Sequence, residues 1–124
     1  MLAPSGVGDR SAARPAKETS VITDQRANEA FEYLRDTTDA IGAAKGELER
    51  SEILRKRTRK RHFLTAEGPV AQREAEAEVN AEVESADERY VDAVTAFATL
   101  SAKRDIETIA LDVWRTESAN RRRA

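Results

Sequence analysis

The chain has 124 residues, of which 35% are charged, and its formal net charge is −2. This length is enough for one domain, and the charge excludes a protein that binds polyanions through bulk positive charge. The lack of cysteine excludes disulfides and thiolate metal sites. There is no apolar run of the ~20 residues that span a membrane and no apolar signal core, so we expect a cytoplasmic protein with no membrane partner.

The apolar residues favour helix over a large core. The chain holds 7 Leu, 5 Ile, 8 Val and 3 Phe against 22 Ala. Alanine is the best helix former but buries little apolar surface. We therefore expect an all-α fold, a long antiparallel helical hairpin that homo-oligomerisation completes.

Residues 1–22, with Pro and Gly among small and charged residues, predict a disordered N-terminal tail. Order begins at Thr23-Asp24, either of which can cap a helix. The first long helix should end near Gly68-Pro69, with the turn of the hairpin at 67–70, because proline cannot continue a helix. Apolar and small residues at alternating spacings of 4 and 3 mark one face of this helix: Ala30, Leu34, Thr37, Ile41, Ala44, Leu48 and Ser51.

The second half of the hairpin follows an acidic, helix-prone stretch over residues 70–84, in which Asn80 is a candidate break. The pattern S-A-D-E at residues 85–88 predicts a capping box and the start of the second long helix. The helical domain then covers residues 23–120, before a basic tail at 121–124. The apolar face of the second helix becomes too wide for one partner helix near its end, which predicts an oligomer interface at Ile106, Ile109, Leu111, Val113 and Trp114.

Nothing in the sequence favours catalysis. The only histidine, His62, lies in a basic run, and no Ser nucleophile has a base at a recognisable spacing. There is also no glycine-rich phosphate loop. We expect a non-enzymatic protein that uses no cofactor and no metal.

A cluster of cations is the sharpest feature of the sequence. Six of the seven residues from 55 to 61 are cationic, and on a helix they cover most of the circumference. An aromatic residue follows directly. Cations beside an aromatic platform suit single-stranded nucleic acid, whose phosphates and bases they contact. The predicted nucleic-acid-binding residues are Arg55, Lys56, Arg57, Arg59, Lys60, Arg61 and Phe63.

The same cations have an alternative role. If the chain folds back at Gly68-Pro69, the basic run lies opposite residues 74–88, which hold seven acidic residues and no basic residue. The two runs would then pair across the hairpin, each exposed pair contributing ~0–1 kcal/mol. The sequence leaves open whether the basic run binds DNA or pairs with Glu74–Glu88.

Several features of the chain follow one another in order: an Ala-Asn with aromatic and Leu residues, a long charged helix, a K-x-R-like motif, an aromatic and a glycine, and a last helix with Trp and a basic end. The residues concerned are Ala27, Asn28, Phe31, Tyr33, Leu34, Arg57-Thr58-Arg59, Phe63, Gly68 and the segment 106–123. This order resembles that of the UvsY-type recombination mediators of phages. The chain departs from the family at Leu64, where the family has a second aromatic, and in its more acidic connection at 69–85.

The resemblance implies a ring-like homo-oligomer that wraps single-stranded DNA. Such a mediator helps load a RecA-like recombinase and displaces single-strand-binding protein, so both proteins are implied as partners. Two other functions remain open, a helical phage structural or scaffolding protein and a coiled-coil interaction module. Binding of single-stranded DNA distinguishes the first function from the other two.

Overall fold

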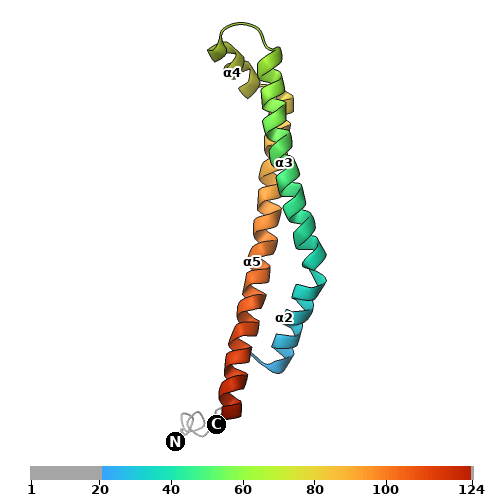
Figure 1. Cartoon of the computed structure of the whole chain (residues 1–124), viewed down its shortest axis with the longest axis vertical. Helices are drawn as coiled ribbons and strands as arrows, with labels where there is room; N and C mark the ends of the chain where they lie inside the picture. Colours follow the sequence, from blue (N-terminus) through green and yellow to red (C-terminus); the bar gives the residue numbers. More distant parts are fainter. Residues whose placement is uncertain (1–20, 124) are drawn as a thin grey trace, which may run out of the picture. The chain divides into compact units, whose positions relative to one another are not determined.

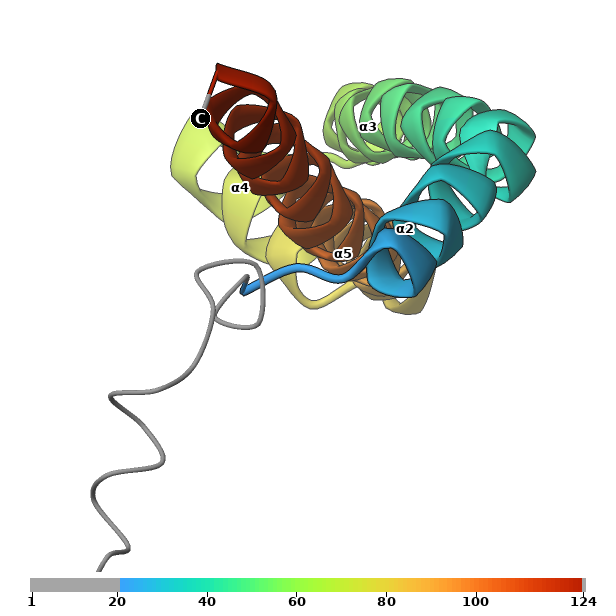
Figure 2. The ribbon, with the colours of Figure 1, turned by 90° about the horizontal axis from the view of Figure 1, so that it is seen from below.

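The computed structural model describes residues 21–123, which form α-helices with no strand among them (Figures 1 and 2). The helices are α2 (Asp24–Asp36), α3 (Thr38–Thr65), α4 (Val70–Glu78) and α5 (Ala81–Arg123). The all-α prediction is therefore confirmed. Residues 1–20 of the predicted tail lie outside the described residues.

The described residues divide into a central unit, residues 36–104, and a terminal unit, residues 21–35 with 105–123. In the central unit α3 and the first part of α5 run antiparallel, because residues late in α3 contact residues early in α5. Arg61 bonds to Glu82, and Lys45 lies over the ring of Phe97. The connection between these two segments contains α4, which lies beside the end of α3 in Figure 1. The expected turn at 67–70 is thus only the first part of this connection.

The helix ends follow local sequence signals, with one unexpected break. The Thr23 hydroxyl accepts a hydrogen bond from the Arg26 backbone N–H at 3.0 Å, which confirms the predicted cap. A break at Thr37 divides the first predicted helix into α2 and α3. Thr37 and Thr38 are β-branched and favour helix weakly. Helix α3 ends at Thr65, close to the predicted end, and Gly68 follows with a φ of +101°, a conformation that glycine adopts without strain.

The start of α5 corrects the predicted capping box. The helix begins at Ala81, so Ser85 lies inside its second turn. The cap is Asn80, whose side-chain oxygen accepts hydrogen bonds from the backbone N–H groups of Glu82, at 2.8 Å, and Val83, at 3.3 Å. The S-A-D-E pattern suits a helix interior as well as a start. Helix α4 ends at Glu78, the chain turns at Val79 and Asn80, and α5 begins at Ala81. Ser85 is therefore too far inside α5 to cap its N-terminus.

Replacing Asn80 with alanine should lower the free energy of unfolding by about 1 kcal/mol, because two backbone N–H groups of α5 lose their acceptor. Ser85→Ala is the matched control and should be neutral or slightly stabilising, since alanine is the better residue inside a helix. Urea unfolding followed by circular dichroism measures both effects. A loss of stability in Ser85→Ala, with none in Asn80→Ala, would instead support a capping box that starts at Ser85.

The core of the described residues is made of small side chains. Val83 is the largest side chain that is fully buried, and Ser51 and Thr58 are the buried polar residues of α3. Small residues let helices approach closely but remove little apolar surface from water. No helix between residues 21 and 123 is both long and apolar enough to cross a membrane. The other buried residues are Ala27, Ala30, Ala77, Ala86, Ala93 and Ala110.

In the terminal unit α2 packs against the last part of α5. Arg26 donates to both carboxylate oxygens of Glu107, at 2.6 and 2.8 Å, and these hydrogen bonds hold the pKa of Glu107 below its usual 4.5. The backbone N–H groups of Val21 and Ile22 donate to Glu117. Helix α5 continues through Arg123, so the basic residues at 121–123 form its last turn rather than a separate tail.

Candidate nucleic-acid interface

The basic run lies in the second half of α3, within the central unit. Its cations separate into two sets according to the side of the helix on which they lie. The paired cations contact carboxylates of α4 and α5, and the exposed cations do not. The paired cations are Arg55, Arg59 and Arg61, and the exposed cations are Lys56, Arg57 and Lys60.

Asp87 connects two of the paired cations to α5. Its carboxylate accepts a hydrogen bond from Arg55 at 3.1 Å and another from Arg59 at 2.9 Å. Arg59 also donates to Glu78 of α4 at 2.5 Å, so it links three helices. The ring of Tyr90 lies 4.8 Å from the Arg55 guanidinium, within cation–π range. About a third of the Arg59 and Asp87 side chains is exposed, 35% of each, so these bonds are partly screened by water.

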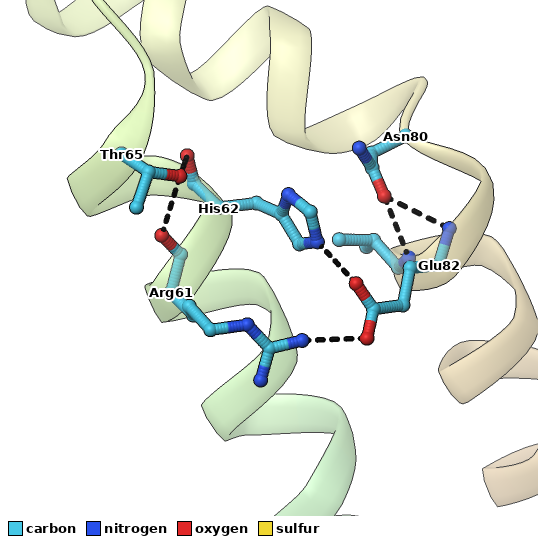
Figure 3. Close-up of polar contacts among 6 residues, drawn as sticks. Arg61, His62, Thr65, Asn80 and Glu82 are labelled. Atoms are coloured by element: carbon cyan, nitrogen blue, oxygen red, sulfur yellow. Dashed lines mark hydrogen bonds and ion pairs between the residues drawn. The ribbon is translucent and has the colours of Figure 1, made fainter.

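Glu82 holds the third paired cation, Arg61, together with the neighbouring His62, as Figure 3 shows at the start of α5. Its carboxylate contacts His62 Nε2 and Arg61, both at 2.6 Å. These hydrogen bonds hold the pKa of Glu82 below its usual 4.5, and the bond with His62 has a larger effect than the bond with Arg61. Because the folded pKa is the lower one, the contribution of Glu82 to stability is present above the unfolded pKa and is lost as the pH falls through the folded value.

The exposed cations have no carboxylate partner on another helix among residues 21–123. Lys56 pairs only with Glu52, one turn earlier in α3, at 3.2 Å, and 70% of its side chain is exposed. Arg57 and Lys60 form no ion pair within the described residues. A polyanion can approach these three side chains without first displacing a carboxylate of another helix.

An open groove of about 710 Å³ separates α3 from α4. Its α3 side is lined by Arg55, Lys56, Arg59, Lys60 and Phe63, and its α4 side by Val70, Glu74, Ala77 and Glu78. The Arg73 guanidinium lies 5.4 Å from the centroid of the Phe63 ring. The groove thus combines cations, an aromatic ring and aliphatic surface, which are the groups that single-stranded nucleic acid contacts.

Of the two sequence-based alternatives for the basic run, pairing with the acidic run therefore applies to some of its residues and not to others. Pairing with the acidic run is found at Arg55, Arg59 and Arg61, whereas Lys56 and Phe63 line the groove and Arg57 stays exposed. The sequence contained a signal for part of this division only. Positions 55, 58 and 62 continue the 4/3 stripe that includes Ser51, so Arg55 and His62 are placed toward α5. Arg59 and Arg61 lie beside this stripe and also pair with α5. Arg73 and Tyr90, which precede and follow the acidic segment, were not predicted as residues of this site.

The structure separates the predicted oligomer-interface residues into two stripes of α5. Leu111 and Trp114 face α2, and Trp114 Nε1 donates to Asp24 at 2.8 Å. Ile106 and Ile109 lie on the other stripe with 58% and 60% of their surface exposed. Val113, at the next turn of that stripe, is half-buried. The apolar arc is wider than α2 can cover, as the sequence predicted.

Comparisons of the chain with protein-family models, curated proteins and solved structures found no match. Within residues 21–123 no group of three or more His, Asp or Glu side chains is placed to hold a metal ion.

Proposed function

We propose that this chain binds single-stranded DNA through its exposed cations and the α3–α4 groove, without catalysing a reaction. The observation that carries the proposal is the position of Lys56 and Lys60, which are both exposed and line a groove that Phe63 also lines. Phosphates would contact the lysines and Arg57, and a base would lie against the apolar surface of the groove. This set of DNA-contacting residues is smaller than the set predicted from the sequence. It leaves out Arg55, Arg59 and Arg61, because each of them already has a carboxylate partner.

We further propose that the protein acts as a recombination mediator in the cytoplasm of the host of a phage. This role is supported by the resemblance to the UvsY-type mediators and by the presence of an exposed basic surface. It implies self-association, so that several basic surfaces contact one strand, and partnership with a RecA-like recombinase and single-strand-binding protein. The exposed Ile106 and Ile109 offer the surface for self-association.

The experiment is fluorescence anisotropy of a labelled single-stranded oligonucleotide at increasing salt. Each phosphate contact contributes about 0.7 to the slope of log K against log salt. Three contacts per subunit predict a loss of roughly 20-fold in affinity between about 50 and about 200 mM salt. Arg57→Gln with Lys60→Gln should reduce the slope by about 1.4 and weaken binding roughly 25-fold at about 0.1 M salt. The circular dichroism spectrum should not change, since neither residue pairs with another helix.

A matched control is Lys103→Gln with Arg122→Gln, which removes the same two charges from exposed positions of α5. This control should keep the parent slope. Equal losses in the two double variants would mean that total charge, and not the α3 surface, governs binding. A parent protein that fails to bind the oligonucleotide even at low salt would end the proposal.

The alternative function is a helical phage structural or scaffolding protein. It is favoured by the ion pairs between helices, since three cations of the basic run already serve the fold. It predicts self-association without DNA affinity, so the same titration distinguishes the two functions.

A further inference from the structure

The two rims of the α3–α4 groove differ in charge. On the α3 rim the exposed Lys56 and Lys60 stand one helical turn apart. On the α4 rim the exposed Glu74 presents a carboxylate. Phe63 and the buried Ala77 supply apolar surface between the rims. A ligand that fits has an anionic group at one end, a planar or apolar middle, and hydrogen-bond donors at the other end.

Glu74 differs from the neighbouring acidic residues of α4 in having an uncommitted carboxylate. Glu78 accepts a hydrogen bond from Arg59, and Glu76 accepts one from Gln72 at 3.4 Å. Glu74 has no hydrogen bond or ion pair within the part of the chain that the structure describes. A carboxylate is an acceptor only, so Glu74 favours ligand groups that donate.

Nucleobases differ in what they offer such an acceptor. Cytosine, adenine and guanine each carry an exocyclic amino group, and a Glu or Asp side chain accepts a hydrogen bond from the N4 amino group of cytosine. Thymine has no amino group, and carbonyl oxygens flank its one ring N–H. These oxygens would lie close to the Glu74 carboxylate and repel it. A nucleotide with its phosphate at Lys56 or Lys60 would bring its base edge toward the α4 rim.

We propose that the α3–α4 groove is a nucleotide subsite in which Glu74 selects amino-bearing bases, so that the protein prefers cytosine over thymine in single-stranded DNA. The inference rests on the proposed function, because it adds a base preference to the same surface. Lys56 and Lys60 give affinity that is independent of the base, and Glu74 gives the preference.

The test compares oligo-dC with oligo-dT of equal length, at neutral pH and constant salt, by fluorescence anisotropy. Both strands are pyrimidine strands that stack weakly on themselves, so the comparison isolates the base edge. The parent protein should bind oligo-dC about five-fold or more tightly. Glu74→Gln should remove the preference, chiefly by tightening the binding of oligo-dT, because the amide both donates and accepts and has no charge.

Glu76→Gln is the matched control, because it removes the same charge from the same helix at a position outside the groove. It should keep the preference for oligo-dC. Equal binding of the two strands by the parent, with the expected salt dependence, overturns the inference and leaves the proposed function intact. A preference that survives Glu74→Gln also overturns it. Failure to bind either strand overturns the inference and the proposed function together.

Discussion

Asp87→Asn is expected to lower the free energy of unfolding by about 2 kcal/mol, because one carboxylate holds two arginines of α3. Hydrogen bonds to charged groups contribute about 1.5–3 kcal/mol each, and partial exposure of Asp87 reduces this range. Asparagine keeps the shape of the side chain but removes the charge that Arg55 and Arg59 contact. Urea unfolding at moderate salt measures the effect. Asp92→Asn is the matched control on an exposed position of the same helix and should change little.

A double-mutant cycle with Arg59→Gln isolates the contact between Arg59 and Asp87. The loss in the double variant should be smaller than the sum of the two single losses, with a coupling of about 1 kcal/mol that decreases at high salt. Purely additive losses would mean that these ion pairs do not hold α3 to α5, and that the paired cations are as available to a polyanion as the exposed ones.

The sequence predicted the features of the fold that depend on periodicity and local chemistry. The 4/3 spacing predicted the helices, and the buried Ala30 and Ser51 lie on the predicted stripe, which the buried Thr58 continues. The Thr23 cap and the end of α3 before Gly68-Pro69 also follow from residue types whose backbone preferences are strong. These signals act within one or two helical turns, so they are readable without knowledge of the packing.

The features that the sequence did not predict depend on contacts between distant residues. The break at Thr37 occurs where Arg104 donates to the Thr37 hydroxyl, a contact between residues 67 positions apart. The start of α5 at Ala81 is different, because it follows a local signal, the cap at Asn80, which competed in the sequence with the S-A-D-E pattern. The roles of the cations likewise depend on which side of α3 meets α5. A run of six cations gives no such direction by itself, since it covers most of the helix circumference.

Ile106→Ser with Ile109→Ser is expected to convert the proposed oligomer to a smaller species without loss of helix. The two residues lie three positions apart on one stripe of α5, and more than half of the surface of each is exposed, 58% and 60%. Full burial of an Ile side chain contributes about 1.5–3 kcal/mol, so removing two of them should weaken association by about 3 kcal/mol, or roughly 100-fold. Light scattering over a range of protein concentrations measures this change.

Trp114→Ala separates self-association from stability, because Trp114 faces α2 and bonds to Asp24. This variant should destabilise the terminal unit while the exposed stripe of Ile106 and Ile109 remains available. We therefore expect Trp114→Ala to lower the thermal midpoint and the double Ile variant to lower the mass. The reverse assignment, in which Trp114→Ala alone reduces the mass of a folded protein, would place the interface on the α2 side of α5. An unchanged mass in both variants would show that self-association, where it occurs, uses another surface.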